Sequence, residues 1–336
     1  MEKDAKIYVA GHRGLVGLAL VRALERAGYT NLVRRTRAEL ELTDGAAVRT
    51  FFAEEKPAYV FVAAAKVGGI VANNTYRAEF IYQNLQIASN VIHEAWRAGV
   101  KRLLYLGSSC IYPRDCPQPM KEEYLLTGPL ELTNQPYSVA KIAGIELCWS
   151  YNRQYGTKFV AAMPNNLYGL GDNYDLETSH VLPALIRKAH EAKARGDKEL
   201  VVWGTGKPRR EFLYSDDAAE ACVFLMILPE ESYCALLASA DSPPLINIGF
   251  GGDQTIRELA ELVKGVAGFE GKLVFDTSKP DGMPRKLLDS SRLSALEWRP
   301  RIGLPAGIGL AYHDFLQRFG ADARAKLADT ASSDRA

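Results

Sequence analysis

A glycine-rich turn near the amino terminus constrains the fold of this 336-residue chain more than any other feature. It joins an apolar run at 7–10 to a helical pattern at 15–27, and its glycines stand at every third position. In a βαβ unit the first glycine permits the tight turn, the second lets the backbone approach a pyrophosphate, and the third allows close helix–strand packing. A turn whose glycines serve packing alone is the alternative. We expect a dinucleotide site made of Gly11, His12, Arg13, Gly14, Leu15, Val16 and Gly17.

Strand and helix patterns alternate through the first half of the chain. Short apolar runs at 32–33, 59–63, 103–106 and 159–163 are separated by helical stretches at 44–54, 77–98 and 137–155. Such alternation predicts βαβ units whose right-handed crossovers stack helices on both faces of a parallel sheet. The expected fold is α/β, a doubly wound Rossmann-type parallel sheet with a smaller C-terminal α/β region that binds substrate.

The pattern of predicted strands, helices and loops changes after residue 163. Loops become longer, short strands are expected at 200–203, 245–248 and 273–275, and helices at 180–194, 215–228 and 255–266. We expect a cofactor-binding domain at 1–165, to which later stretches return, and a mainly substrate-binding region at 166–320. Residues 321–336, rich in Ala, Asp and Ser, are expected to form a flexible tail.

Charge and cysteine content exclude several classes of protein. The 41 lysines and arginines balance the 40 aspartates and glutamates to a net charge of +1, so we expect no broad nucleic-acid surface, although a local basic pocket remains open. No apolar run approaches the roughly 18 residues of a membrane span. The five scattered cysteines form no Cys-x-x-Cys pair, which argues against a disulfide framework or a zinc site. We expect a cytoplasmic protein with free thiols and no nucleic-acid, membrane or metal partner.

The segment after the second strand bears on the choice of cofactor. NAD sites usually place an acidic residue there to hold the ribose hydroxyls, whereas this chain has Arg34-Arg35-Thr36-Arg37. Arg37, together with Arg13, is suited to bind a 2′-phosphate through charge-assisted hydrogen bonds. We therefore expect NADP(H). Two alternatives stay open: the arginines only solvate a surface turn, or Glu39 or Glu41 is the acidic ribose ligand.

A second constellation combines a serine, a tyrosine and a lysine. Tyr137 and Lys141 are four residues apart and so share one face of the predicted helix. A phenol has an ordinary pKa of about 10, and a nearby ammonium lowers that pKa by favouring the phenolate. Ser108, at the end of the fourth strand, completes the set. A Tyr-x-x-x-Lys pair alone is common, but its combination with the glycine turn is specific.

Together these features resemble the extended branch of the short-chain dehydrogenase/reductase superfamily, with its Ser/Tyr/Lys catalytic set. Where the dehydratases of that branch carry Glu and its 4-epimerases carry Thr, this chain has Cys110. If the backbone is extended there, Ser108 and Cys110 face the same side, and a thiol of pKa about 8.5 suits removal of an acidic C–H proton. A small buried apolar residue is the alternative role for a free cysteine. His180, at a predicted helix start, is the candidate partner acid.

At this level of detail the chain is similar to the GDP-L-fucose synthases. The resemblance covers nearly the whole chain and rests on stretches at 11–17, 63–70, 107–113, 137–144, 164–169, 203–213 and 279–288. Residues 169–172 replace the family's usual Gly-Pro turn, and 232–243 is a variable stretch. The resemblance implies an NADPH-dependent enzyme that converts GDP-4-keto-6-deoxy-D-mannose to GDP-L-fucose by 3,5-epimerisation and then reduction at C4.

The resemblance also implies roles for further residues. It adds to the cofactor site Leu106, Gly107, Ser109, Lys141, Pro164, Asn165, Asn166, Leu167 and His180. It assigns to the nucleotide sugar Lys188, Trp203, Arg210, Asp281, Arg285 and Lys286. It further implies a homodimer through the helices at 77–98 and 137–155. The alternatives are a nucleotide-sugar 4-epimerase or 4,6-dehydratase of the same superfamily, and a non-catalytic NADP(H)-sensing scaffold.

Overall fold

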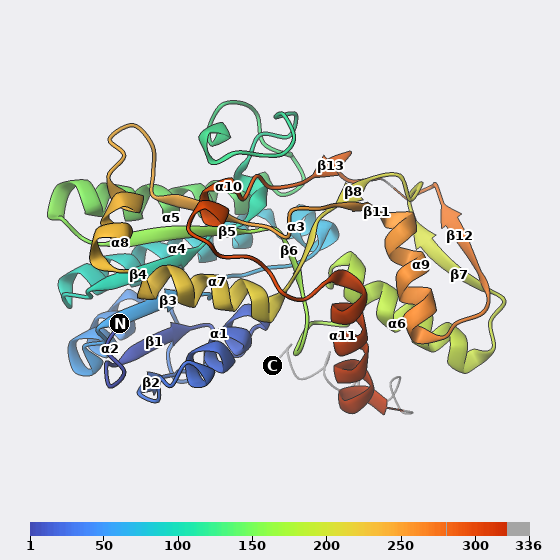
Figure 1. Ribbon diagram of the computed structural model, residues 1–336, viewed down its shortest axis with the longest axis horizontal. Coiled ribbons are helices and arrows are strands. Elements are labelled where there is room, and N and C mark those ends of the chain that lie inside the picture. The colour runs from blue at the N-terminus through green and yellow to red at the C-terminus, as the bar shows by residue number, and fades with distance from the viewer. Residues whose placement is uncertain (280, 321–336) are drawn as a thin grey trace.

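The computed structural model describes residues 1–279 and 281–320, so the predicted tail at 321–336 lies outside the described residues. Its centre is a parallel sheet with the strand order β10-β5-β4-β3-β1-β2 (Figure 1). These strands are β1 (Ile7–Ala10), β2 (Leu32–Val33), β3 (Tyr59–Val62), β4 (Arg102–Leu106), β5 (Phe159–Pro164) and β10 (Leu245–Ile248). Most of their residues are buried, as expected for strands covered on both faces. The predicted α/β fold is confirmed.

Helices cover both faces of this sheet and give three layers (Figure 1). On one face lie α2 (Gly45–Glu55), α4 (Arg77–Arg97) and α5 (Gln135–Tyr155). On the other, α1 (Leu15–Arg26) packs against α7 (Ser215–Ile227). Each face therefore has its own apolar core, built from alternate side chains of the same strands. Among the described residues, none of the helices is long and apolar enough to cross a membrane.

The order of the strands locates a crevice. β1 lies between β2 and β3, so the connections on its two sides run in opposite directions across the sheet. In open α/β sheets, ligands bind at such a switch point, outside the carboxyl ends of the strands. Gly11 follows β1 directly, with a φ of +81° that disfavours any residue with a side chain.

The second region has a core of its own. Helices α6 (Val181–Arg195), α9 (Ile256–Ala267) and α11 (Leu304–Phe319) pack around the paired strands β7 (Glu199–Trp203) and β12 (Lys272–Asp276). The start of α9 is fixed by a capping box between Thr255 and Glu258. Short pairings complete the region: β6 (Asn166–Tyr168) with β9 (Phe212–Tyr214), and β8 (Arg209–Arg210) between β11 (Gln254–Thr255) and β13 (Arg285–Lys286).

The two regions interleave along the chain. After β9, α7 returns to pack on α1, and β10 adds to the edge of the large sheet beside β5. Three short helices fill the connections: α3 (Ile70–Thr75), α8 (Glu230–Leu237) and α10 (Ser291–Ala295). The division at residue 165 stays a prediction, but the crossings place β8, β9 and β13 close to the carboxyl end of β5, where a site can draw on both regions.

Candidate active site

A cavity of about 1280 Å³ opens at the carboxyl ends of β1, β3, β4 and β5. We call it the carboxyl-end cavity. All five predicted catalytic residues line it: Ser108, Cys110, Tyr137, Lys141 and His180. So do most of the predicted cofactor residues, namely Gly11, Arg13, Gly14, Leu15, Val16, Gly17, Arg37, Leu106, Gly107, Ser109, Pro164, Asn165, Asn166 and Leu167. The structure thus brings into one hollow residues that are far apart in the sequence.

The three glycines of the turn serve different purposes. A Cβ on Gly11 would lie 2.6 Å from the backbone nitrogen of Ala64, and one on Gly17 would lie 2.0 Å from the carbonyl oxygen of Gly11. Both positions therefore require close backbone packing. Gly14 is the exposed N-cap of α1, and a Cβ there would meet nothing nearer than 3.5 Å. A side chain at Gly14 would project into the space beside the helix N-terminus, where backbone N–H groups attract a pyrophosphate. The turn fits a dinucleotide.

Three arginines lie on the wall of the cavity near this turn. Arg13 and Arg37 were predicted there, and Arg35 joins them. Arg37 pairs with Glu41 at 2.6 Å, and Arg35 contacts Glu55. Glu41 therefore also lies on the wall, but its carboxylate is engaged with an arginine. Three guanidinium groups around one end of the cavity favour an anion such as a 2′-phosphate.

The turn that carries the predicted base is not extended. Ser108 has extended backbone angles, but Ser109–Ile111 forms a single 3-10 turn. The premise of an extended backbone for Cys110 is therefore wrong, because the chain turns at once after β4. Ser108 and Cys110 nevertheless both reach the cavity wall. Only 6% of the surface of Cys110 is exposed, so the accessible part of this residue lies at the cavity wall rather than in bulk water.

Tyr137 and Lys141 lie one turn apart on α5. Burial raises the pKa of Tyr137, Cys110 raises it further, and the hydroxyl of Ser108 opposes the shift. Burial lowers the pKa of Lys141 to about 8. Its Nζ lies 5.8 Å from the centre of the Tyr137 ring and donates to the carbonyl of Leu106 at 2.7 Å. Lys141 is thus held by β4 near the phenol, and no carboxylate of the described residues lies within 4 Å of it.

His180 faces the same cavity from the other region. It is the N-cap residue of α6 and makes no side-chain capping hydrogen bond, so its ring is free to act elsewhere. The ring is open to the cavity but has protein on most sides. This burial, with a smaller contribution from Lys286, lowers its pKa. Burial also lowers the pKa of Lys286, while the proximity of Cys110 raises it. A lysine therefore stands near both the predicted base and the predicted acid.

The remaining predicted substrate residues form a second group, outside the lining of that cavity. Trp203 is 52% exposed, and the Nζ of Lys188 lies 4.8 Å from its ring centre. Asp281 binds the backbone N–H of Thr205, next to the glycine that follows Trp203. The guanidinium of Arg210 donates a hydrogen bond to the carbonyl of Met283 at 2.6 Å, and its positive charge helps to lower the pKa of Lys286. This group therefore extends the cavity from Lys286 towards an exposed indole.

Two predicted residues lie apart from the rest. Arg285 pairs with Asp253 on the opposite side of β13 from Lys286, because neighbouring residues of a strand point to opposite faces. The His12 side chain is absent from the lining, and its Nδ1 atom is buried without a hydrogen-bond partner among the described residues. Sequence reasoning missed two others. Arg35 carried a visible signal, the arginine run itself, whereas the fully buried Glu211 carried none.

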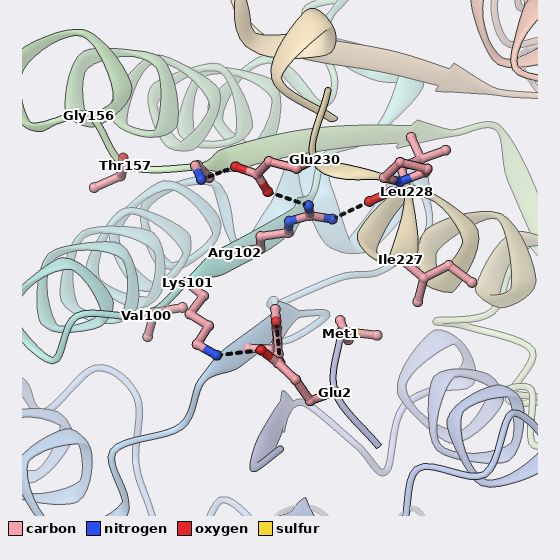
Figure 2. Close-up of a pocket in the computed structure, with 13 residues that line it drawn as sticks. Met1, Glu2, Val100, Lys101, Arg102, Gly156, Thr157, Ile227, Leu228 and Glu230 are labelled. Atoms are coloured by element: carbon pink, nitrogen blue, oxygen red, sulfur yellow. Dashed lines mark hydrogen bonds and ion pairs between the residues drawn. The ribbon is translucent and has the colours of Figure 1, made fainter. Parts of the chain in front are cut away.

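A smaller hollow of about 630 Å³ lies at the opposite, amino-terminal ends of the strands; we call it the amino-end pocket (Figure 2). Figure 2 shows its cations directed at carboxylates: Lys101 at Glu2, and Arg102 at Glu230. The distances are 2.6 Å and 2.8 Å. Lys158 also pairs with Glu230. These ion pairs lower the pKa of Glu2 and of Glu230 to about 2 each. The lysines and the arginine that line this pocket are therefore all engaged with carboxylates.

Comparison with known proteins agrees with the geometry of the cavity. The chain belongs to the NAD dependent epimerase/dehydratase family, whose model matches residues 7–235. Within it, GDP-L-fucose synthase 1 of Arabidopsis thaliana is 58% identical over 316 residues, which cover 94% of each chain. GDP-L-fucose synthase of Escherichia coli is 54% identical over 93% of this chain and 97% of its own. The resemblance predicted from the sequence is confirmed.

A solved structure is similar over the same length. A GDP-D-glycero-L-gluco-heptose synthase from Campylobacter jejuni, determined in the presence of NADPH, superposes with a TM-score of 0.88 at 42% identity. The alignment covers 94% of this chain and 99% of that one. The shared architecture therefore includes the second region as well as the large sheet.

Proposed function

We propose that this enzyme converts GDP-4-keto-6-deoxy-D-mannose to GDP-L-fucose, first inverting C3 and C5 and then reducing C4 with NADPH. One observation carries the proposal. Cys110 and His180 line the same cavity as Ser108, Tyr137 and Lys141, so groups for proton removal, proton return and carbonyl reduction share one site. Relatives of the chain named GDP-L-fucose synthase support the same reaction.

The cofactor is NADP(H), held at the glycine turn. The Gly14 end of α1 would receive the pyrophosphate, and Arg13, Arg35 and Arg37 the 2′-phosphate. When bound, NADPH supplies the hydride for C4. The Campylobacter relative with NADPH, at 42% identity, supports this assignment. The alternative of an acidic ribose ligand is weakened because Glu41 is paired with Arg37.

The epimerisation follows from the acidity of the hydrogens beside the C4 carbonyl. Cys110 would remove the proton at C3 or C5 as a thiolate, and the resulting enolate oxygen would be stabilised by the hydroxyls of Ser108 and Tyr137. His180, which reaches the cavity from α6, would return a proton from the other face. Its lowered pKa keeps the ring mostly neutral at pH 7, so only the protonated fraction can donate.

Reduction uses the same oxygen-binding groups. Tyr137 would give its proton to the C4 oxygen as negative charge develops there. Lys141 stands behind the phenol as an ammonium, which favours the phenolate that remains. The raised pKa of Tyr137 in the protein alone means that the phenol starts as the acid, in the protonation state that the step needs.

The substrate, the oligomer and the location are also proposals. Trp203, Lys188, Arg210 and Lys286 would bind the GDP moiety through stacking and through cations that face the diphosphate. A homodimer would bury exposed apolar side chains of α4 and α5, including Tyr82 (62% exposed) and Val139 (39%). A cytoplasmic location fits a mechanism that needs NADPH and a reduced thiol at Cys110.

The test is to mix the purified protein with GDP-4-keto-6-deoxy-D-mannose and NADPH and to follow absorbance at the nicotinamide band. We expect NADPH to be consumed and GDP-L-fucose to form. A 4-epimerase or 4,6-dehydratase would need no external reductant, and a sensing scaffold would turn nothing over. Absence of NADPH consumption with correctly folded protein would therefore reject the proposal.

A further inference from the structure

Glu211 is a carboxylate in the interior of the protein without a counter-charge. It is fully buried between β8 and β9, and no lysine, arginine or histidine among the described residues lies within 4 Å of it. Three N–H donors satisfy it instead. They come from the side chain of Asn165 at 2.5 Å and from the backbones of Leu288 at 3.0 Å and Gly251 at 2.7 Å. A buried carboxylate is costly unless such donors surround it.

These donors belong to segments that carry the active site. Asn165 follows β5 directly, Leu288 follows the cavity residue Lys286, and Gly251 follows β10. The backbone of Glu211 adds to the connection, because its N–H donates to the carbonyl of Lys286 at 3.1 Å. One side chain thus joins the large sheet to the strand pair β8–β13 of the second region.

The connection continues to the turn that carries the predicted base. The Oγ atom of Ser109 donates to Oδ1 of Asn165 at 3.2 Å, and Nδ2 of Asn165 donates to Glu211. Ser109 lies between Ser108 and Cys110 in the 3-10 turn. The direction of each hydrogen bond is fixed, because a carboxylate can only accept. Glu211 therefore orients the Asn165 amide, together with the carbonyl of Lys286 and the amide of Asn166, and the Asn165 oxygen is offered to Ser109.

We propose that Glu211 is a positioning residue: through Asn165 and Ser109 it fixes the turn of Ser108 and Cys110 relative to Lys286. This inference rests on the proposed function for its kinetic readout but not for its chemical one. Effective proton removal needs the thiol within about 3–3.5 Å of its target, and a 1 Å displacement can cost about 100-fold in rate. The three hydrogen bonds supply that precision without touching the reacting atoms.

The first variant is Glu211→Gln, which keeps the shape and removes the charge. A glutamine has one acceptor oxygen and one donor amide, so its amide must face either the N–H of Gly251 or those of Asn165 and Leu288. We expect this contact between donors to displace the side chain and to loosen the hydrogen bonds that lead through Asn165 to Ser109. Glu122→Gln is the matched control, because Glu122 is a partly buried carboxylate that accepts a backbone N–H, from Asn247, and shares no hydrogen bond with Asn165 among the described residues.

The kinetic readout separates the two chemistries of the proposed reaction. In D₂O, deuterium enters the product at each inverted carbon, so NMR gives the ratio of epimerised product to product reduced without inversion. We expect Glu211→Gln to lower this ratio at least about 10-fold relative to the wild type and to Glu122→Gln. A merely structural role would slow both steps in parallel. An unchanged ratio in Glu211→Gln would overturn the proposal.

The chemical readout is independent of the substrate. The rate at which iodoacetamide alkylates Cys110, measured by mass spectrometry, reports its environment, and the exposed Cys234 serves as an internal reference. We expect Glu211→Gln to change the Cys110 rate several-fold and the Cys234 rate not at all. If wild-type enzyme fails to turn over, the proposed function fails, while this rate still decides the role of Glu211.

Two further variants guard against misfolding. The exchange Glu211→Gln/Asn165→Asp restores one acceptor facing one donor, and we expect it to recover the alkylation rate of Cys110. Ser109→Ala removes only the last link, without disturbing the buried carboxylate. If Glu211→Gln does not fold, Ser109→Ala decides: it should shift both the product ratio and the Cys110 rate in the same direction. Wild-type values in Ser109→Ala would overturn the proposal.

Discussion

The two ends of the large sheet carry hollows of opposite electrostatic character. In the amino-end pocket, Lys101 and Arg102 each meet a carboxylate within 3 Å. In the carboxyl-end cavity, Lys141 and Lys286 have no such partner among the described residues. Burial accordingly lowers the pKa of both lysines, that of Lys141 to about 8. Both hollows are rich in cations, but among the described residues only the carboxyl-end cavity has lysines without a carboxylate partner.

The difference shows where stability has been exchanged for function. A lysine whose pKa falls from 10.5 to about 8 on folding destabilises the native state at neutral pH by roughly 3 kcal/mol. The native state binds fewer protons than the unfolded state over this range. The destabilisation is therefore fully present below pH 8 and is relieved as the pH rises towards 10.5. In the amino-end pocket, Lys101, Arg102 and Lys158 are instead paired with carboxylates. Uncompensated charge, rather than the presence of a hollow, therefore marks the functional end.

The largest effect should come from the carboxyl-end cavity. Cys110→Ser replaces a thiol by a hydroxyl that is a far weaker base at neutral pH. We expect epimerisation, measured as deuterium entry at C3 and C5, to fall about 10²- to 10⁴-fold, the range of a general base. The dissociation constant for NADPH should stay within a factor of two, because the glycine turn is untouched. Normal turnover of the 4-keto substrate by this variant would contradict the assignment of Cys110.

At the amino end the corresponding variant should affect stability alone. Arg102→Met leaves the carbonyls of Met226 and Leu228 without their side-chain donor and removes one of the two cations that pair with Glu230. We expect a loss of about 2–4 kcal/mol in the free energy of unfolding, measured by urea denaturation, with kcat unchanged. Lys101→Met is the control, since its pair with Glu2 is half-exposed and worth less than about 1 kcal/mol. A large fall in kcat for Arg102→Met would break the contrast between the two ends.

Much of the carboxyl-end cavity could be predicted because its parts are local signals. The glycine turn, the Tyr137–Lys141 spacing and the arginine run are each contained within seven residues. The strands of the large sheet were equally visible, as buried apolar runs between helical stretches. In contrast, Glu211 acts through contacts with Asn165 and Leu288, and no spacing in the sequence indicates them.

Local propensity also misled at particular elements. The helix α11 was not predicted, because its first turns contain glycine at 307 and 309, which weakens a helix. Tertiary packing overrides this, since a Cβ on Gly307 would lie 2.1 Å from the hydroxyl of Tyr168. The condition of an extended backbone at 108–110 also fails, because the chain forms a 3-10 turn over Ser109–Ile111 that packs against α5.

A third prediction compares the effects of replacing one lysine from each hollow, Lys286 and Lys158, by methionine. Lys286→Met removes a partly buried charge that has no carboxylate partner among the described residues, so we expect kcat/KM to fall about 10-fold and the protein to become more stable by about 1 kcal/mol. Lys158→Met removes half of an ion pair with Glu230 and should lower stability slightly while leaving kcat/KM unchanged. Thermal melts and steady-state kinetics of the two variants measure both quantities. Destabilisation by Lys286→Met would show that its charge is compensated after all.

The smallest effect is a pH dependence that belongs to the carboxyl end alone. With a pKa of about 8, Lys141 is mostly an ammonium at pH 7 and mostly a neutral amine at pH 9. The reduction step should therefore slow by up to about 10-fold over this interval, as the cation behind Tyr137 is lost. Lys141→Arg keeps a charge that does not titrate below pH 12, so its rate, although lower, should be flat from pH 7 to 9. Stopped-flow oxidation of NADPH measures the rate of reduction in both enzymes across this pH range. Because the variant alters only the titrating group, an equally steep decline in the two enzymes would assign the pH dependence to a residue other than Lys141.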